Sequence, residues 1–246
     1  MVEQFENFPN PPIQEALVDF RVAFSVLPTQ EEIRRLIPLL NTRYPNYSEI
    51  TRINATIEFG VGGGTTNQQA NFGGLRFESN SDNFVFQAQV DGFTLSKLKP
   101  YRNWAELISE ATSLWEKYCE VLKPISIERV ACRYINRIEI NDRGLDFDNY
   151  LTAAPKVPLK LPQGVSRFLT QIEIPAPAEG TTVVVTQALE GVSNETPAFV
   201  LDLDVFKVMS YSINGNQWWS DLEQLRVLKN QFFFENITEK SKELFR

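Results

Sequence analysis

The sequence ISIERVACRYINRIEI, residues 125–140, carries the strongest strand pattern in this chain. Successive side chains of a strand point to opposite faces of a sheet, so residues two apart share a face. One face of this stretch is mostly apolar and carries Val130, Cys132, Tyr134, Asn136, Ile138 and Ile140. The other carries the arginines Arg129, Arg133 and Arg137, together with Ala131, Ile135 and Glu139. The pattern predicts a central strand with one face in the core.

The three arginines leave two interpretations open. They either form ion pairs with carboxylates of neighbouring strands or bind a protein partner or a small anion on an exposed sheet face. Arg133 and Arg137 would be the anchors, because a guanidinium group can hold a carboxylate or phosphate through two hydrogen bonds. Asp202 and Asp204, two apart on a later predicted strand, are the carboxylates expected near them. A magnesium site at this aspartate pair would need further ligands.

Asn136 lies on the apolar face of the predicted strand. A buried side-chain amide needs hydrogen-bond partners. It is therefore either a structural bridge to backbone groups or a polar contact inside a ligand pocket.

The rest of the chain alternates between strand and helix patterns. Thr29 and Glu32 form a capping box at the start of a helix, and Asn103 precedes the clearest amphipathic helix. Residues 60–74, which include GVGGG, predict a flexible hairpin connection between strands. Further strands are expected at 15–26, 47–59, 75–79, 84–90, 93–98, 166–174, 181–188 and 198–208, and a closing helix at 217–246.

In chain order these elements form two similar halves, 1–124 and 125–246, with one continuous domain as the alternative. Each half has a strand, helical cover, three or four antiparallel strands and a long amphipathic helix. We therefore expect an α+β protein of two β-α-β(3-4)-α halves with internal duplication. Each antiparallel sheet would bury its apolar face under its own helix, in a TATA-binding-protein-like or helix-grip-like shape.

Composition excludes several functions. The 246 residues include 43% hydrophobic residues and 18 Phe, which indicates a packed globular protein, and carry a net charge of −7. That charge disfavours nucleic acid as a partner. The chain has no histidine, so Ser-His-Asp and Cys-His catalytic groups are excluded. We expect no metal and no cofactor, and the sequence offers no catalytic constellation.

Cys119 and Cys132 lack the CxxC spacing and lie in a predicted helix and strand, which favours two free thiols. Free thiols fit a reducing cytoplasm. The beginning, MVEQFENFPNPP, is unlike a signal peptide, and no segment has the ~20 apolar residues of a membrane span. We therefore expect a cytoplasmic protein without membrane contact.

Three motifs carry a resemblance that spans nearly the whole chain: NPPIQEALVDF at 10–20, RYINRIEI at 133–140, and Leu225-Arg226, Lys229-Asn230, Phe232-Phe233 and Ile237-Thr238 near the end. The chain resembles a sporadically distributed family of uncharacterised prokaryotic proteins of about this length. Sporadic occurrence is typical of accessory genes, so the resemblance implies a role of the defence or toxin-antitoxin type and assigns no functional residue.

Two functional hypotheses follow. The first is a non-catalytic binding protein that engages a protein partner or its own copy through a polar sheet face or the groove between the halves. The second is a small-molecule-binding protein with a pocket between the sheet and a long helix, lined by polar groups such as Tyr134 and Asn136.

Overall fold

The computed structural model describes residues 5–60, 63–140, 146–191 and 196–246, with side chains outside 54–68. Nine strands form a single antiparallel sheet in the order β2-β3-β4-β5-β1-β6-β9-β8-β7. The strands are β1 (Ile13–Ala23), β2 (Asn46–Gly60), β3 (Gly63–Glu78), β4 (Phe84–Gln89), β5 (Gly92–Leu98), β6 (Ser126–Glu139), β7 (Leu169–Pro175), β8 (Thr181–Glu190) and β9 (Ala198–Ser212). The helices are α1 (Gln30–Arg34), α2 (Leu36–Leu40), α3 (Trp104–Leu122), α4 (Gln217–Asn236), α5 (Glu239–Glu243) and the 3-10 turn η1 (Phe147–Asn149).

The expectation of two halves with separate sheets is wrong. β1 pairs with β5 on one side and with β6 on the other, so the sheet runs unbroken from the early strands to the late ones. The physical reason is that an isolated sheet ending at β1 or at β6 would leave a row of unpaired backbone groups at its edge. Pairing β1 with β6 supplies hydrogen-bond partners for the backbone groups of both strand edges.

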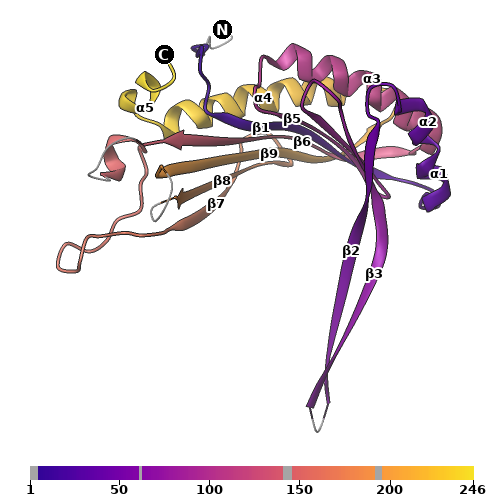
Figure 1. The fold of residues 1–246 in the computed structure, drawn as a ribbon, viewed down its shortest axis with the longest axis horizontal. Coiled ribbons are helices and arrows are strands. Elements are labelled where there is room, and N and C mark those ends of the chain that lie inside the picture. The colour runs from indigo at the N-terminus through magenta and orange to yellow at the C-terminus, as the bar shows by residue number, and fades with distance from the viewer. Residues whose placement is uncertain (1–4, 61–62, 141–145, 192–195) are drawn as a thin grey trace.

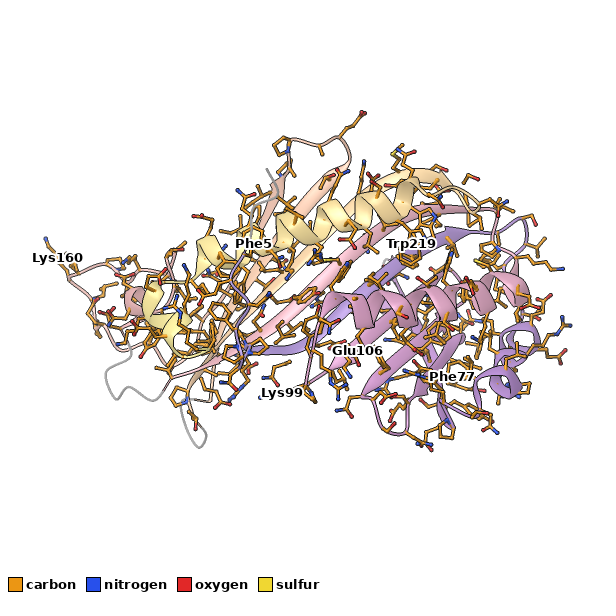
Figure 2. The ribbon with its side chains drawn as sticks, turned by 90° about the horizontal axis from the view of Figure 1, so that it is seen from above. Phe5, Phe77, Lys99, Glu106, Lys160 and Trp219 are labelled. Carbon is orange, nitrogen blue, oxygen red and sulfur yellow. The ribbon has the colours of Figure 1, made fainter. Side chains whose placement is uncertain are left out.

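The predicted central strand is confirmed as β6. Val130, Tyr134 and Ile138 are at most 2% exposed, as are the other residues of the predicted apolar face. Both long helices lie on that side, with α3 against β5 and α4 against β6 and β9. Figure 1 shows them above the sheet, and Figure 2 shows them crossing the same face. The apolar alternation therefore marks the helix-covered face.

An aromatic cluster joins the two helices to the middle of the sheet. The ring of Phe20 on β1 lies 5.2 Å from Trp115 of α3 and 5.0 Å from Trp218 of α4, edge to face in both cases. It also stacks on Phe93 of β5 at 5.2 Å. Phe20 is fully buried. The Phe20 side chain therefore connects the sheet to both long helices, α3 and α4.

The expected hairpin connection at 60–74 is also wrong, because most of it is strand. β2 and β3 pair from Asn46 with Glu78 to Gly60 with Gly63. β4 reaches only as far as Gly74, so the rest of the hairpin is a two-stranded ribbon, which projects away from the helices in Figure 1. A register shift opposite Gly73 marks where it leaves the sheet. Long-range pairing with β2 decides the conformation of this tract, whereas its glycines alone favour a loop.

The helix boundaries follow local capping. Thr29 and Glu32 form the predicted capping box, and α1 ends at Arg34. The side chain of Asn103 accepts a hydrogen bond from the Glu106 N–H at 2.9 Å and begins α3. The predicted closing helix is divided into α4 and α5 near Ile237. Within the described residues, none of the helices combines the length and apolar character needed to cross a bilayer.

Truncating the aromatic cluster should destabilise the whole sheet. We expect Phe20→Ala to lower the free energy of unfolding by about 3–5 kcal/mol, because the cavity would lie beneath both helices. Leu39→Ala on α2, where the side chain is 52% exposed, is the control and should change it by less than about 0.5 kcal/mol. Urea unfolding measures both. Equal effects of the two substitutions would contradict this account of the core.

Candidate functional site

The sheet face opposite the helices carries the predicted arginine row, and we call Arg129, Arg133, Arg137 and their partners the arginine face. Arg129 Nη1 donates to Asp19 Oδ1 at 2.8 Å, and its Nη2 donates to Asp204 Oδ2 at 3.2 Å. Thr94 Oγ1 donates to the other oxygen of Asp19 at 2.6 Å. Burial raises the pKa of Asp204, and Arg129 opposes that shift. Arg129 thus lies between two carboxylates.

The other two arginines are also paired. Arg133 holds Asp202 through two hydrogen bonds, Nε to Oδ1 at 2.8 Å and Nη2 to Oδ2 at 2.5 Å. Arg137 donates to Glu139 at 2.5 Å and to the carbonyl of Thr196 at 3.3 Å. Every predicted arginine therefore has a carboxylate partner within the chain. This geometry favours the ion-pair interpretation of the row, while binding of a partner to this face stays a prediction.

The contribution of these ion pairs to stability should follow their burial. Asp19 is 7% exposed, so Arg129→Met would leave a largely buried carboxylate with only the more distant Arg21, at 3.5 Å, and should cost about 2–4 kcal/mol. Arg137→Met breaks a pair whose Glu139 side chain is 57% exposed and should cost less than about 1 kcal/mol. Denaturant unfolding of both variants is the measurement. A larger loss for Arg137→Met would show that the arginine face is not held as described.

Asn136 forms the predicted structural bridge, whereas its contact with a ligand stays a prediction. Its amide nitrogen donates to the carbonyl of Leu201 at 3.0 Å and to that of Tyr134 at 3.4 Å, so it links β6 to the neighbouring strand β9. Asn136 and Tyr134 also line a cavity of about 550 Å³ on the helix-covered face. A pocket between sheet and long helix is therefore present, in the size range of small-molecule sites.

Four parts of the chain form this cavity, which we call the Lys229 pocket. Its walls are an N-terminal arm (5–13), the start of α3 (101–105), β6 at Tyr134 and Asn136, and α4 at 226–234. Figure 2 labels Phe5 of the arm beside α4. Residues that lie far apart in the sequence therefore meet at one site.

The N-terminal arm is fastened to the end of the chain. Phe5 stacks on Phe234 at 5.2 Å, and Phe8 meets the edge of Phe245 at 5.3 Å. Both oxygens of Glu6 accept hydrogen bonds from Arg246 at 2.8 Å. The Arg246 guanidinium also lowers the pKa of Glu6. The arm thus forms a wall of the pocket, and its single carboxylate is already paired.

Lys229 is the most unusual group at the pocket. It is 7% exposed, and its Nζ lies 3.6 Å from the centre of the Tyr134 ring. Nζ also donates to Asn230 Oδ1 at 2.5 Å. In the part of the chain that the structure describes, Lys229 has no carboxylate at ion-pair distance. Burial lowers its pKa to about 8, with Arg226 adding to the shift and Cys132 opposing it.

Two tyrosines line the pocket together with Lys229. The hydroxyls of Tyr101 and Tyr134 are 2.8 Å apart and share a hydrogen bond. Burial raises the pKa of Tyr101 to about 12 and that of Tyr134 well above its usual value. Both hydroxyls are therefore protonated at neutral pH, and the O–H that is not used in their shared hydrogen bond can donate to another group.

The pocket is cationic in a protein of negative net charge. Its described lining has three cations, Arg102, Arg226 and Lys229, and one carboxylate, Glu6. Arg226 binds Glu223 at 3.2 Å and lies over the Trp104 ring at 5.6 Å. The start of α3 adds the positive end of a helix dipole. The site is therefore suited to a negatively charged group.

Lys229 was not among the predicted site residues, although the sequence contains a signal for it. Leu222, Leu225, Lys229 and Phe233 are spaced at three and four residues and are all buried on α4. A lysine at an apolar position of a helix face is unusual, because ammonium groups are seldom fully buried without a partner.

No protein-family model matches the chain, and no curated protein sequence matches it. The resemblance carried by the three motifs therefore stays a prediction. Among the described residues, no group of three acidic or cysteine side chains is placed to hold a metal ion.

Removing the buried charge should stabilise the protein. We expect Lys229→Met to raise the free energy of unfolding at neutral pH by about 1–3 kcal/mol, because it removes an ammonium group from an apolar site while keeping the side-chain volume. The native pKa of Lys229 is about 8 against an ordinary value of 10.5. As the pH rises, Lys229 loses its proton in the native state before it does so in the unfolded state. The destabilisation by the buried ammonium group is therefore complete below about pH 8 and disappears as the pH rises towards 10.5.

The measurement is urea unfolding of both proteins at about pH 7 and about pH 10. The stability difference between them should narrow at the higher pH. A difference that stays constant, or a variant that is less stable at neutral pH, would mean that Lys229 is already compensated within the fold.

Proposed function

We propose that the chain is a binding protein for small organic anions, which it holds in the Lys229 pocket. The observation that carries the proposal is a lysine that is 7% exposed, lines a cavity of about 550 Å³, and lacks a carboxylate partner among the described residues. A buried ammonium group without a counter-charge destabilises the empty protein. An anion entering the pocket would supply the missing charge.

The residues that line the pocket indicate which groups the ligand carries besides its anionic group. Aromatic rings from the arm, the segment that leads into α3, β6 and α4 line the pocket. Phe5 of the arm stacks on Phe234 of α4, and Tyr101 meets Tyr134 of β6 edge to face. The aromatic residues of the lining are Phe5, Phe8, Tyr101, Trp104, Tyr134, Phe233 and Phe234. Such rings bury apolar or aromatic surface well. The ligand class is therefore an apolar or aromatic body bearing one carboxylate, sulfonate or phosphate group.

The arginine face supports a protein-partner function less well, because its three guanidinium groups are already occupied within the chain. Binding of a protein partner or of a second copy stays a prediction. A cytoplasmic location belongs to the same proposal and is supported by the two free cysteines, of which Cys132 is buried.

Anilinonaphthalene sulfonate tests the proposal, since it joins an aromatic body to one anionic group and fluoresces when bound. We expect saturable binding to the native protein and at least about tenfold weaker binding to Lys229→Met, because a charge-assisted hydrogen bond contributes about 1.5–3 kcal/mol. Lys160→Met, on an exposed loop labelled in Figure 2, is the control and should bind within about twofold of the wild type.

N-phenylnaphthylamine, which has a similar aromatic body and no sulfonate, separates charge from hydrophobic contact. It should bind the wild type and Lys229→Met equally. Near-ultraviolet circular dichroism confirms that each protein is folded, because this dye class also binds loosened states. Equal sulfonate binding by the wild type and Lys229→Met, or no saturable binding by the wild type, would overturn the proposal.

A further inference from the structure

The group at the centre of the pocket is an amine, and an amine can do more than attract an anion. A neutral lysine side chain is a nucleophile that attacks carbonyl carbon, and enzymes activate it by desolvation or by a nearby cation. Lys229 has both conditions, since it is 7% exposed and Arg226, one turn earlier on α4, also lines the cavity. No described carboxylate holds its Nζ in the charged form.

We propose that Lys229 forms a reversible imine with a small oxo-acid, an aldehyde or ketone that carries a carboxylate, inside the Lys229 pocket. The inference rests on the proposed function, because the carboxylate would be held by the cationic lining while the carbonyl carbon meets Nζ. The lone pair of Nζ attacks that carbon, the carbonyl π electrons move to oxygen, and one Nζ proton transfers to that oxygen to form a carbinolamine. The carbinolamine hydroxyl then leaves as water together with the remaining nitrogen proton, which gives a C=N bond and needs no oxidant or reductant.

The surroundings of Nζ fit both steps. Burial lowers the pKa of Lys229 to about 8, with Arg226 adding to the shift and Cys132 on β6 opposing it, so roughly a tenth is the free amine at pH 7, against less than about a thousandth for an ordinary lysine. Nζ lies over the ring of Tyr134, whose hydroxyl is bonded to that of Tyr101. One O–H of the pair is used in their shared hydrogen bond, and the other can donate to the carbonyl oxygen and then to the departing hydroxyl.

The experiment is reductive trapping with glyoxylate and cyanoborohydride on the full-length protein, followed by peptide mapping. Reduction of the imine leaves a stable carboxymethyl group on the lysine. We expect Lys229 to be labelled at least about tenfold faster than Lys160, because an ordinary lysine is almost entirely protonated at neutral pH. Labelling should saturate with glyoxylate concentration, and anilinonaphthalene sulfonate should protect Lys229 and leave Lys160 unaffected.

Lys229→Arg removes the nucleophile, since arginine forms no such imine, and should lose the carboxymethyl group at position 229. Binding of anilinonaphthalene sulfonate by the wild type is measured beside the trapping and reports on the proposed function alone. If wild-type Lys229 reacts no faster than Lys160 while the dye still binds, imine formation is refuted and the anion-binding function stands. If the wild type fails to bind the dye, the proposed function itself fails.

Discussion

The pairing of β1 with β6 is the constraint on which the other features depend. It joins the early and late strands into one sheet and sets the register in which Val18 lies opposite Cys132 and Ala16 opposite Tyr134. The same pairing brings Asp19 within reach of Arg129 on the other face. One ladder of backbone hydrogen bonds therefore positions both the wall of the pocket and the arginine face.

The two faces of this sheet differ in whether their buried charged side chains have partners of opposite charge among the described residues. On the arginine face, guanidinium groups and carboxylates alternate across neighbouring strands, so each buried charge has a partner. On the helix-covered face, α4 brings Lys229 over an aromatic ring, with no described carboxylate opposite it. A paired network indicates architecture, whereas an unpaired buried charge at a cavity indicates a site for something from outside.

The sequence predicted those features that depend on local periodicity. Alternation in β6 identified its buried face, and the cap at Asn103 identified the start of α3. It could not predict which strand edges meet, because β1 is separated from β6 by more than a hundred residues and pairing between strands leaves no periodic signal. The same limit affected the glycine-rich tract of β3, whose strand conformation comes from pairing with β2. The Lys229 pocket depends on such long-range contacts at every wall.

The walls of the pocket also connect ligand binding to the two ends of the chain. The arm is held through Glu6 and Phe8 by the C-terminal residues Phe245 and Arg246, and Phe5 packs on α4 beside the cavity. A ligand that contacts the arm, β6 and α4 together binds only the folded arrangement of all three, so it stabilises that arrangement by mass action. In the empty pocket, Lys229 has no described carboxylate partner and destabilises the fold. Binding of an anion and the stability of the protein are therefore linked through this one side chain.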